Sequence, residues 1–193
     1  AGEILALCRG AGIRTEAADK SLRRISGKDN CYAAAVFRKS PRPQDAARNH
    51  LTLVSPMDAG NVGTILRTAL GLGFTDVALV QPCADPFDPG VVRASMGALF
   101  SLRLSEYADF AAYRAAYPDH ALFPFMLDGS VPLSEAVNAK KEPFTLVFGN
   151  EGSGLPGEFA GMGTPVRIEQ GEAVDSLNLA VACGIGMYAF RNV

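Results

Sequence analysis

The sequence contains few of the residues that bind metals or form disulfide frameworks. Its two histidines are His50 and His120, and its four cysteines are Cys8, Cys31, Cys83 and Cys183. No two of these residues have the short spacing of a zinc site, so we expect no bound metal. Single, scattered cysteines are typical of a reducing compartment, which favours a cytoplasmic location.

The sequence also has no hydrophobic run long enough to cross a membrane. Its longest apolar stretch, residues 179–190, contains Gly184 and Gly186 and is too short for a bilayer. This stretch therefore predicts a buried helix, and we expect no membrane partner. The first residues have no basic head followed by an apolar core, so they predict no secretory signal.

Charge is distributed unevenly along the chain. Residues 1–50 contain ten Lys or Arg and five Asp or Glu, whereas residues 51–193 contain eight and fifteen. A basic N-terminal segment on an acidic body indicates where a polyanion docks. A solvated basic surface would give the same counts, so charge alone does not decide between the two.

The length of 193 residues suits one domain with a small appendage. Within residues 1–39 we predict a helix at residues 3–10 and a strand at residues 32–37. A polar stretch with two prolines, RKSPRPQDAAR, then predicts a linker at residues 40–49. A segment of 39 residues cannot bury much core by itself, so it is either a domain fragment or an arm that packs on the body.

From His50 onward, apolar runs of strand length alternate with segments of helical spacing. The expected strands are residues 51–54, 77–80, 121–126, 144–148 and 166–168. The expected helices are residues 61–72, 89–99, 108–116 and 176–190. This alternation predicts an α/β domain over residues 50–193, with a mostly parallel sheet flanked by helices. Ligands of such sheets bind beyond the carboxyl ends of the strands, so the loops at that edge form the candidate site.

The loop after the first expected strand leads into a helix at SPMDAGNVGTILR, residues 55–67. Asn61 is placed to cap that helix, and Gly63 leaves room for a neighbour that approaches closely. Arg67 lies two turns into the helix, on the face opposite most of the apolar stripe. Taken alone, the segment fits an ordinary capped helix with a surface arginine better than it fits a site.

The second segment, LVFGNEGSGLP at residues 146–156, runs from an apolar strand into a glycine-rich loop. No Gly-Lys-Ser/Thr follows, so this is no phosphate loop, and Glu151 would repel the pyrophosphate of a dinucleotide. Exposed backbone groups beside a carboxylate suit a neutral or cationic ligand. A tight loop that needs positive φ at several glycines explains the pattern equally well.

The third segment, DSLNLAVACGIGMYAF at residues 175–190, clusters its polar side chains at the start of an apolar helix. We expect Ser176 to cap this helix and Asn178 to lie in its first turn. Helix capping alone would account for Ser176.

Together, in this order and at these separations, the three segments resemble the three motifs of the SpoU family of RNA methyltransferases, in the SPOUT superfamily. The matching residues are Asn61 and Arg67 in the first motif, Gly149, Asn150, Glu151 and Gly152 in the second, and Ser176, Leu177 and Asn178 in the third. The segment RASMGALF, residues 93–100, resembles the piece that this family carries between its first two motifs. The resemblance covers roughly residues 50–193.

The resemblance implies an α/β fold with a C-terminal trefoil knot, and a homodimer whose active site lies close to the subunit interface. It implies S-adenosylmethionine as the methyl donor and a ribose 2′-hydroxyl of structured rRNA or tRNA as the acceptor, with no DNA partner. Residues 1–39 resemble the tail of the small N-terminal RNA-binding domain of many relatives. RNA phosphates would contact the basic residues of this stretch, which include Arg23, Arg24, Lys28, Arg38 and Lys39.

The resemblance also implies which residues form the site. The catalytic candidates are Arg67, Asn61, Glu151, Ser176 and Asn178. The cofactor-binding candidates are Phe148, Gly149, Asn150, Gly152, Ile168, Ser176 and Leu177. Because an arginine stays protonated, Arg67 suits stabilising the developing alkoxide or orienting the adjacent phosphate better than acting as a base. If a protein base is needed, Glu151 is the one candidate carboxylate within the motifs.

One stretch departs from the family pattern. Relatives often carry an Ile-Pro-Met type sequence before the third motif, where this chain has RIEQGEAVDS. Arg167, Glu169 and Gln170 make this edge more polar, which leaves the adenine and substrate contacts open. The main alternative is an RNA-binding module with an inactive methyltransferase fold. A nucleotide-binding α/β protein is a third reading, against which the missing phosphate loop argues.

Overall fold

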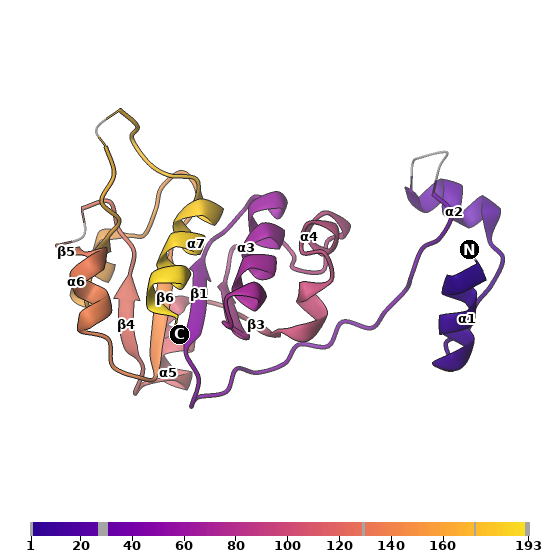
Figure 1. Cartoon of the computed structure of the whole chain (residues 1–193), viewed down its shortest axis with the longest axis horizontal. Coiled ribbons are helices and arrows are strands. Elements are labelled where there is room, and N and C mark those ends of the chain that lie inside the picture. The colour runs from indigo at the N-terminus through magenta and orange to yellow at the C-terminus, as the bar shows by residue number, and fades with distance from the viewer. Residues whose placement is uncertain (1, 27–30, 129, 172, 192–193) are drawn as a thin grey trace. The chain divides into compact units, whose positions relative to one another are not determined.

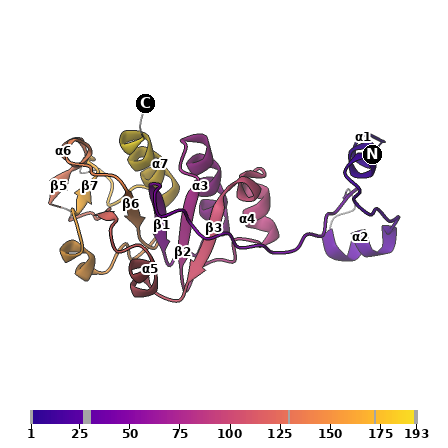
Figure 2. The ribbon, with the colours of Figure 1, turned by 90° about the horizontal axis from the view of Figure 1, so that it is seen from below.

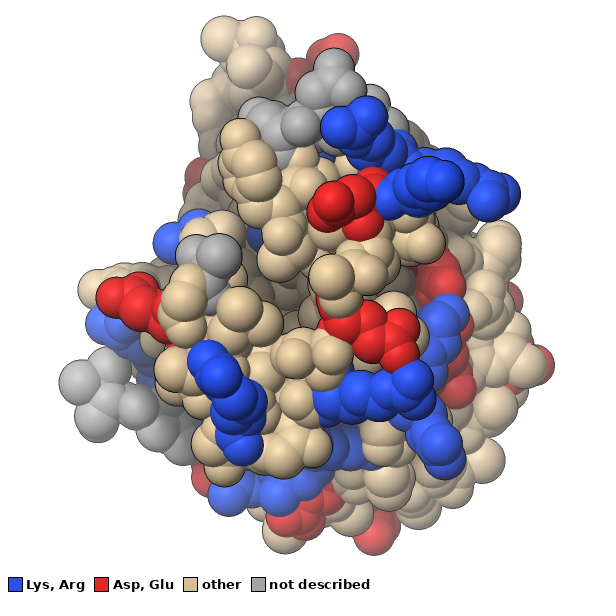
Figure 3. All heavy atoms as spheres, turned by 90° about the vertical axis from the view of Figure 1, so that its right-hand side faces the viewer, with Lys and Arg blue, Asp and Glu red and all other residues tan. Residues whose placement is uncertain are grey.

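The computed structural model of this chain describes residues 2–26, 31–128, 130–171 and 173–191. The chain divides into two compact units, Ala1–Lys39 and Ser40–Val193. The division falls at the start of the polar, proline-containing stretch. Figure 3 shows one face of the molecule, on which Lys and Arg side chains form several groups with carboxylates between them.

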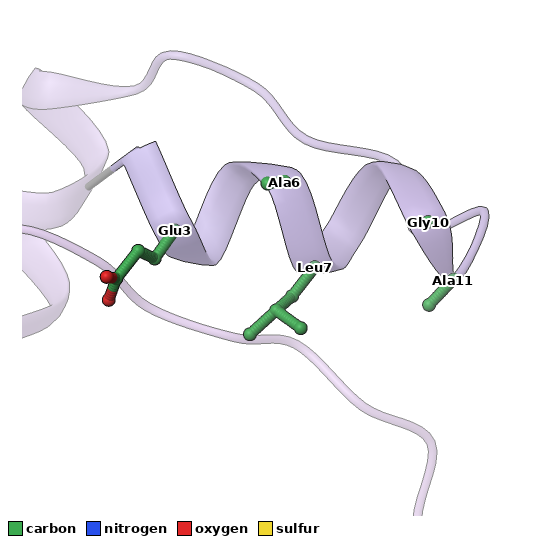
Figure 4. Close-up of a pocket in the computed structure, with 5 residues that line it drawn as sticks. All are labelled: Glu3, Ala6, Leu7, Gly10 and Ala11. Carbon is green, nitrogen blue, oxygen red and sulfur yellow. The ribbon is translucent and has the colours of Figure 1, made fainter.

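The first unit contains helices α1 (Gly2–Gly10) and α2 (Asp19–Ser26), and neither helix has a buried residue. A shallow hollow runs along α1 beside Leu7, whose side chain is 73% exposed (Figure 4). The strand expected at residues 32–37 is wrong, because those residues have no regular structure. A strand needs a neighbour for its backbone hydrogen bonds, and the pattern of side chains does not supply one. Lys28 lies outside the described residues.

The second unit is built on a five-stranded parallel sheet with the order β3-β2-β1-β6-β4. Its strands are β1 (His50–Val54), β2 (Asp76–Val80), β3 (Arg103–Tyr107), β4 (Ala121–Pro124) and β6 (Phe144–Phe148). A small parallel pair joins β5 (Val131–Pro132) to β7 (Val166–Arg167). The expected parallel α/β fold is therefore confirmed. The sequence pattern did not predict β3, because this edge strand reads RLSEY and lacks a continuous apolar run.

Helices cover both faces of the sheet (Figures 1 and 2). One face carries α3 (Ala59–Gly71), α4 (Pro89–Ala94), α6 (Leu133–Asn138) and α7 (Leu179–Phe190), and the other carries α5 (Phe110–Ala116). Two 3-10 helices are η1 (Ala98–Ser101) and η2 (Gly157–Gly161). The helix expected at residues 89–99 is too long: Met96 and Gly97 have φ of 51° and 87°, which ends helical geometry after Ala94. The helix α6 was not predicted.

The main core lies between the sheet and the face that carries α3, α4 and α7. Helix α7 buries Leu179, Cys183, Met187 and Phe190, which confirms the expected buried helix. Gly63 also meets its expectation: a Cβ there would lie 2.4 Å from the Ala94 Cβ, so α3 and α4 cross at this glycine. No helix in the described part of the chain is both long and apolar enough to span a membrane.

Residues 42–46, expected to be linker, lie against the amino-terminal edge of the sheet. The Arg42 amide donates to the Leu104 carbonyl at 3.0 Å, and the buried Gln44 side chain donates to the Val77 carbonyl. Two buried histidines hold the same segment. His50 Nε2 bonds to the Asp45 carbonyl at 2.9 Å, and His120 Nε2 bonds to the Ala46 carbonyl at 3.0 Å. We call residues 42–46 the strap.

Candidate functional site

The three motif loops meet at the carboxyl edge of the sheet. Strands β1 and β6 are neighbours, with Leu53 opposite Phe148, so the loops that follow them lie side by side. Helix α7 packs against α3, which places the third segment next to the first. This is the edge where parallel sheets bind their ligands.

A pocket of about 380 Å³ opens between these loops. Its lining includes all seven residues that the resemblance assigned to the cofactor: Phe148, Gly149, Asn150, Gly152, Ile168, Ser176 and Leu177. Of the catalytic candidates, Glu151 and Ser176 line the pocket, whereas Arg67, Asn61 and Asn178 do not. Among the described residues, the lining contains two carboxylates, Asp128 and Glu151, and no Lys or Arg.

The glycine-rich loop is closed by its own backbone around the Asn150 side chain. The amides of Asn150 and Gly154 donate to each other's carbonyls at 3.1 and 3.0 Å. The Asn150 side-chain oxygen accepts from the Gly152 amide at 2.9 Å and from the Ser153 amide at 3.1 Å. Its Nδ2 donates to the Ser55 carbonyl at 2.9 Å. These hydrogen bonds set the shape of the loop and hold it to the end of β1.

Glu151 fastens the second motif to the first. Its carboxylate accepts from the Asp58 amide at 3.0 Å and from the Met57 amide at 3.1 and 3.2 Å. Burial raises the pKa of Glu151, but these amides and the Asn61 side chain outweigh burial and hold the pKa below its usual value. An ionised carboxylate with this many donors is a weak base, so the geometry favours a holding role.

Asn61 and Asn178 connect the first motif to the third. Asn178 Nδ2 donates to Asn61 Oδ1 at 3.1 Å, and the Asn61 amide donates to Asp58, whose own amide donates to Glu151. Hydrogen bonds that run from Glu151 through Asp58 and Asn61 to Asn178 therefore join three segments that are far apart in sequence.

Both expected helix caps are wrong. Asp58, and not Asn61, caps α3 by accepting from the Asn61 amide at 2.7 Å. Asn178, and not Ser176, caps α7 by accepting from the amides of Ala180 and Val181. Helix α3 begins earlier than expected and α7 begins later. Several polar residues near each helix start could serve as the cap, and the path of the preceding loop selects one of them. Ser176 is left free to line the pocket.

Arg67 lies outside the pocket of its own chain. It is exposed on α3, two turns beyond Asn61, or about 9 Å along the helix axis. Helix α7 separates α3 from the pocket: Ala182 lines the pocket, whereas Gly184 faces α3, where a Cβ on it would lie 3.7 Å from the Thr68 side chain. These two α7 residues are about 200° apart around the helix.

The sequence did not single out the pocket wall formed by the end of β4. Phe125, Met126, Leu127 and Asp128 all line the pocket, and Phe125 stacks on Phe148 with ring centroids 4.2 Å apart. These residues follow a strand at the carboxyl edge, so the strand prediction carried a usable signal. Gln170, from the stretch that departs from the family pattern, also lines the pocket and donates to the Asp175 carbonyl at 3.3 Å.

Comparison with known proteins identifies the family. The SpoU rRNA Methylase family matches residues 48–188. The chain belongs to the SpoU family. The three segments and the pocket they form are thus its SpoU motifs, and the resemblance seen in the sequence is confirmed. A trefoil knot in the C-terminal part of this SpoU domain stays a prediction.

Relatives and solved structures agree with this assignment. The chain is 33% identical over 159 residues to an uncharacterized tRNA/rRNA methyltransferase of Synechocystis. The aligned region covers 80% of this chain and 56% of that protein. It is 31% identical to a 23S rRNA (adenosine(1067)-2′-O)-methyltransferase of Streptomyces laurentii, in an alignment that covers 100% of this chain and 75% of that protein. An AdoMet-bound rRNA methyltransferase from Sinorhizobium meliloti has a TM-score of 0.74 and 33% identity, covering 89% and 69%. The chain thus spans little more than half of the Synechocystis relative.

Proposed function

We propose that this chain carries the catalytic domain of an enzyme that transfers a methyl group from S-adenosylmethionine to a ribose 2′-hydroxyl of rRNA or tRNA. The observation that carries the proposal is the charge of the pocket. Its described lining holds two carboxylates and no Lys or Arg, so a phosphate is disfavoured and a cationic ligand is favoured. S-adenosylmethionine is such a ligand, because it carries a sulfonium and an ammonium group.

The pocket's residues fit the donor by size and by chemistry. A volume of about 380 Å³ lies within the range of small-molecule sites, which begins at about 300 Å³. Phe125, Phe148 and Ile168 offer apolar walls to a flat ring, and the loop from Gly149 to Gly154 offers backbone groups. The Sinorhizobium meliloti neighbour is described as AdoMet-bound, which supports this donor.

The donor supplies an already activated methyl group, so the protein's task is to position the acceptor and stabilise its charge. The reacting 2′-oxygen bonds to the methyl carbon as the carbon–sulfur bond breaks. The sulfur leaves with the electron pair of that bond as S-adenosylhomocysteine, and the hydroxyl proton passes to solvent water. We assign Glu151, Asn61 and Asn178 to holding the motif loops in register. We assign Arg67 to stabilising the negative charge that develops on the 2′-oxygen, since its charge is fixed.

Arg67 reaches the chemistry through a homodimer in this proposal. Helix α7 exposes three apolar side chains at helical spacing, Val181, Ile185 and Tyr188, which are 51%, 37% and 59% exposed. A second copy that covers this stripe buries them and brings its own surface to the neighbouring pocket. Each Arg67 then serves the pocket of the partner copy, because α7 separates it from its own.

The basic N-terminal unit contributes RNA affinity in this proposal. Its described cations include Arg9, Lys20, Arg23 and Arg24, and its helices bury no residue. Such a unit grips phosphates without reading sequence. The four cysteines are free, which fits a cytoplasmic location. An inactive RNA-binding module has no support, because every polar motif residue is present.

Calorimetry tests the donor site. S-adenosylhomocysteine is expected to bind the chain with a one-to-one stoichiometry and raise its melting temperature, whereas ATP and NAD leave the melting temperature unchanged. Transfer of labelled methyl groups to ribosomal RNA and transfer RNA tests the acceptor. The methylated riboses are then mapped as the positions at which the RNA resists alkaline cleavage. Stabilisation by ATP without stabilisation by S-adenosylhomocysteine would refute the proposal.

A further inference from the structure

The donor pocket has a buried apolar end and an exposed polar end. Phe125 and Phe148 line it with side chains that are 8% and 2% exposed, whereas Asp128 and Gln170 line it from exposed positions. The segment from Phe125 to Asp128 runs from the first end to the second. A ligand of this pocket is therefore expected to place a flat apolar part inside and a charged part at the exposed end, because a buried charge without a partner is costly.

The two carboxylates of the pocket differ in what already binds them. Glu151 accepts from the amides of Met57 and Asp58, so its charge is used to hold the first motif. Asp128 forms no hydrogen bond or ion pair with any residue that the structure describes. Because the described lining also contains no Lys or Arg, Asp128 is the carboxylate available to a cationic group of a ligand.

Helix α7 contacts the two pocket rings at a glycine. A Cβ on Gly186 would lie 2.8 Å from the Cζ atoms of both Phe125 and Phe148. Gly186 lies one turn beyond Ala182, which lines the pocket, so it is on the side of α7 that faces the rings. Both rings belong to the close-packed main core, and the pocket is the open space beside them. A side chain at position 186 would therefore push the rings toward the pocket.

We propose that Asp128 determines which adenosine compounds the pocket accepts, because it binds the ammonium group at the amino-acid end of the donor. The adenine lies against the Phe125–Phe148 pair, and Gly186 is the positioning residue that keeps this pair out of the adenine's space. The carboxylate of the amino-acid end faces solvent, since the described lining holds no cation to meet it. The proposal rests on the proposed function, because it names how the same pocket selects its ligand.

A contact between Asp128 and the ribose hydroxyls is the main alternative, because a carboxylate also accepts hydrogen bonds from a diol. The two contacts predict different selectivity. Every adenosine compound with an intact ribose would make the diol contact, whereas only a compound with an amino-acid end makes the ammonium contact. Two ligands that differ in this end alone therefore distinguish them.

Calorimetry with S-adenosylhomocysteine and 5′-methylthioadenosine tests Asp128. Both compounds contain adenine and ribose and have no net charge, but only the first has the amino-acid end. Asp128→Asn is expected to weaken S-adenosylhomocysteine binding about fivefold, as for one partly exposed ion pair, and to leave 5′-methylthioadenosine binding unchanged. Glu158→Gln removes an exposed carboxylate outside the lining and is the control, which is expected to leave both affinities unchanged. An equal loss for both ligands, or no loss for either, would overturn the proposal.

Gly186→Ala tests the adenine end. It is expected to weaken both ligands equally, roughly tenfold, because both contain the adenine that the displaced rings would meet. Adding Phe125→Leu to this variant shortens one of the two side chains and is expected to restore part of both affinities. A loss confined to S-adenosylhomocysteine, or no recovery in a folded double variant, would contradict the position of the adenine.

The same titrations separate this inference from the proposed function. If the unaltered chain binds neither ligand, the proposed function fails and this inference fails with it. If the chain binds S-adenosylhomocysteine and Asp128→Asn binds both ligands normally, the proposed function stands and the role of Asp128 is refuted. Asp128 is exposed, so its variant is expected to fold, and thermal unfolding of each variant verifies this.

Discussion

Two glycines of the second motif are needed for different physical reasons. A Cβ on Gly149 would lie 2.2 Å from the backbone carbon of Gly154, so a side chain there breaks the closed loop. A Cβ on Gly152 would meet only the Asn150 side-chain oxygen, at an ordinary 3.6 Å. Gly152 lines the pocket, so the space beside it is available to a ligand. Gly149 therefore serves the fold, and we assign Gly152 to the donor.

Gly152→Val is expected to abolish binding of S-adenosylhomocysteine and leave thermal unfolding near that of the unaltered chain. The valine fits the protein but occupies the space of the ligand. Gly149→Ala is the comparison, and overpacking there is expected to destabilise the fold by about 2 kcal/mol. Calorimetry and thermal unfolding of both variants check this. A folded Gly152→Val variant with normal affinity would remove this loop from the donor site.

Arg67 is the residue whose position argues most directly for a role in the chemical step. It lies outside the donor pocket, so it contributes nothing to donor affinity through its own chain. In the proposed function, the charge of Arg67 stabilises a negative charge that appears only in the transition state, which is where a fixed donor accelerates a reaction.

Arg67→Ala is expected to keep the affinity for S-adenosylhomocysteine and slow single-turnover methylation by about 10²–10³-fold. Arg67→Lys is expected to recover little, because a lysine lacks the planar, two-pronged contact. The measurement is methyl transfer from labelled donor to RNA beside a donor titration. Full activity of the alanine variant, or a loss explained wholly by weaker donor binding, contradicts the assignment.

At the scale of elements, the strap shows how buried imidazoles hold an irregular segment on a sheet. Nε2 of each histidine is hydrogen-bonded to a backbone carbonyl oxygen, which can only accept, so each Nε2 carries a proton. His50 Nδ1 then accepts from the Tyr113 hydroxyl at 2.9 Å. Burial lowers the pKa of His50 from 6.5 to about 4, and it lowers the pKa of His120 as well. Both imidazoles are therefore neutral in the folded protein near neutral pH.

Acid is expected to destabilise the strap. The folded-state pKa of His50 is lower than its unfolded value, so its contribution to stability is present above about pH 6.5 and is lost as pH falls toward 4. Between pH 7 and pH 5 the loss from His50 is on the order of 2 kcal/mol. Urea unfolding at both pH values measures it. His50→Gln removes this titration and is expected to reduce the difference; an equal difference in the variant would show that other groups cause it.

At the scale of the whole molecule, the apolar stripe of α7 distinguishes this helix from an ordinary core helix. Its inner side packs in the main core, whereas Val181, Ile185 and Tyr188 face outward. Large apolar side chains in a continuous exposed stripe mark an interaction surface. In the proposed function, a dimer through this surface brings Arg67 of one copy to the pocket of the other.

Sedimentation of the chain at micromolar concentration is expected to show a dimer, and Ile185→Glu is expected to shift it to a monomer with intact donor affinity. Mixing an Arg67→Ala chain with a Gly152→Val chain tests the shared site. Each mixed dimer contains one pocket with a working donor loop that faces an intact arginine, so activity is expected to return. No recovery in mixed dimers whose formation is verified would place Arg67 on the pocket of its own chain.

The sequence by itself determined the parallel α/β class and the three motif segments, because these depend on local signals: apolar runs of strand length, glycines that follow them, and polar residues at helix starts. The family resemblance then pointed to seven of the residues that line the pocket. The glycine at position 63 also indicated a close approach by a neighbour, and α3 and α4 cross there. The missed strand β3 and the wrong strand at residues 32–37 show the limit, because edge strands and isolated segments depend on pairing partners.

Only the tertiary structure decided how the motifs act together. Asp58 and Asn178 cap the two helices, and hydrogen bonds run from Glu151 through Asp58 and Asn61 to Asn178, because β1 and β6 pair across more than ninety residues of sequence. The same packing places α7 between Arg67 and the pocket. Strand order and helix packing set these relations through contacts between distant segments, and no window of local sequence contains that information.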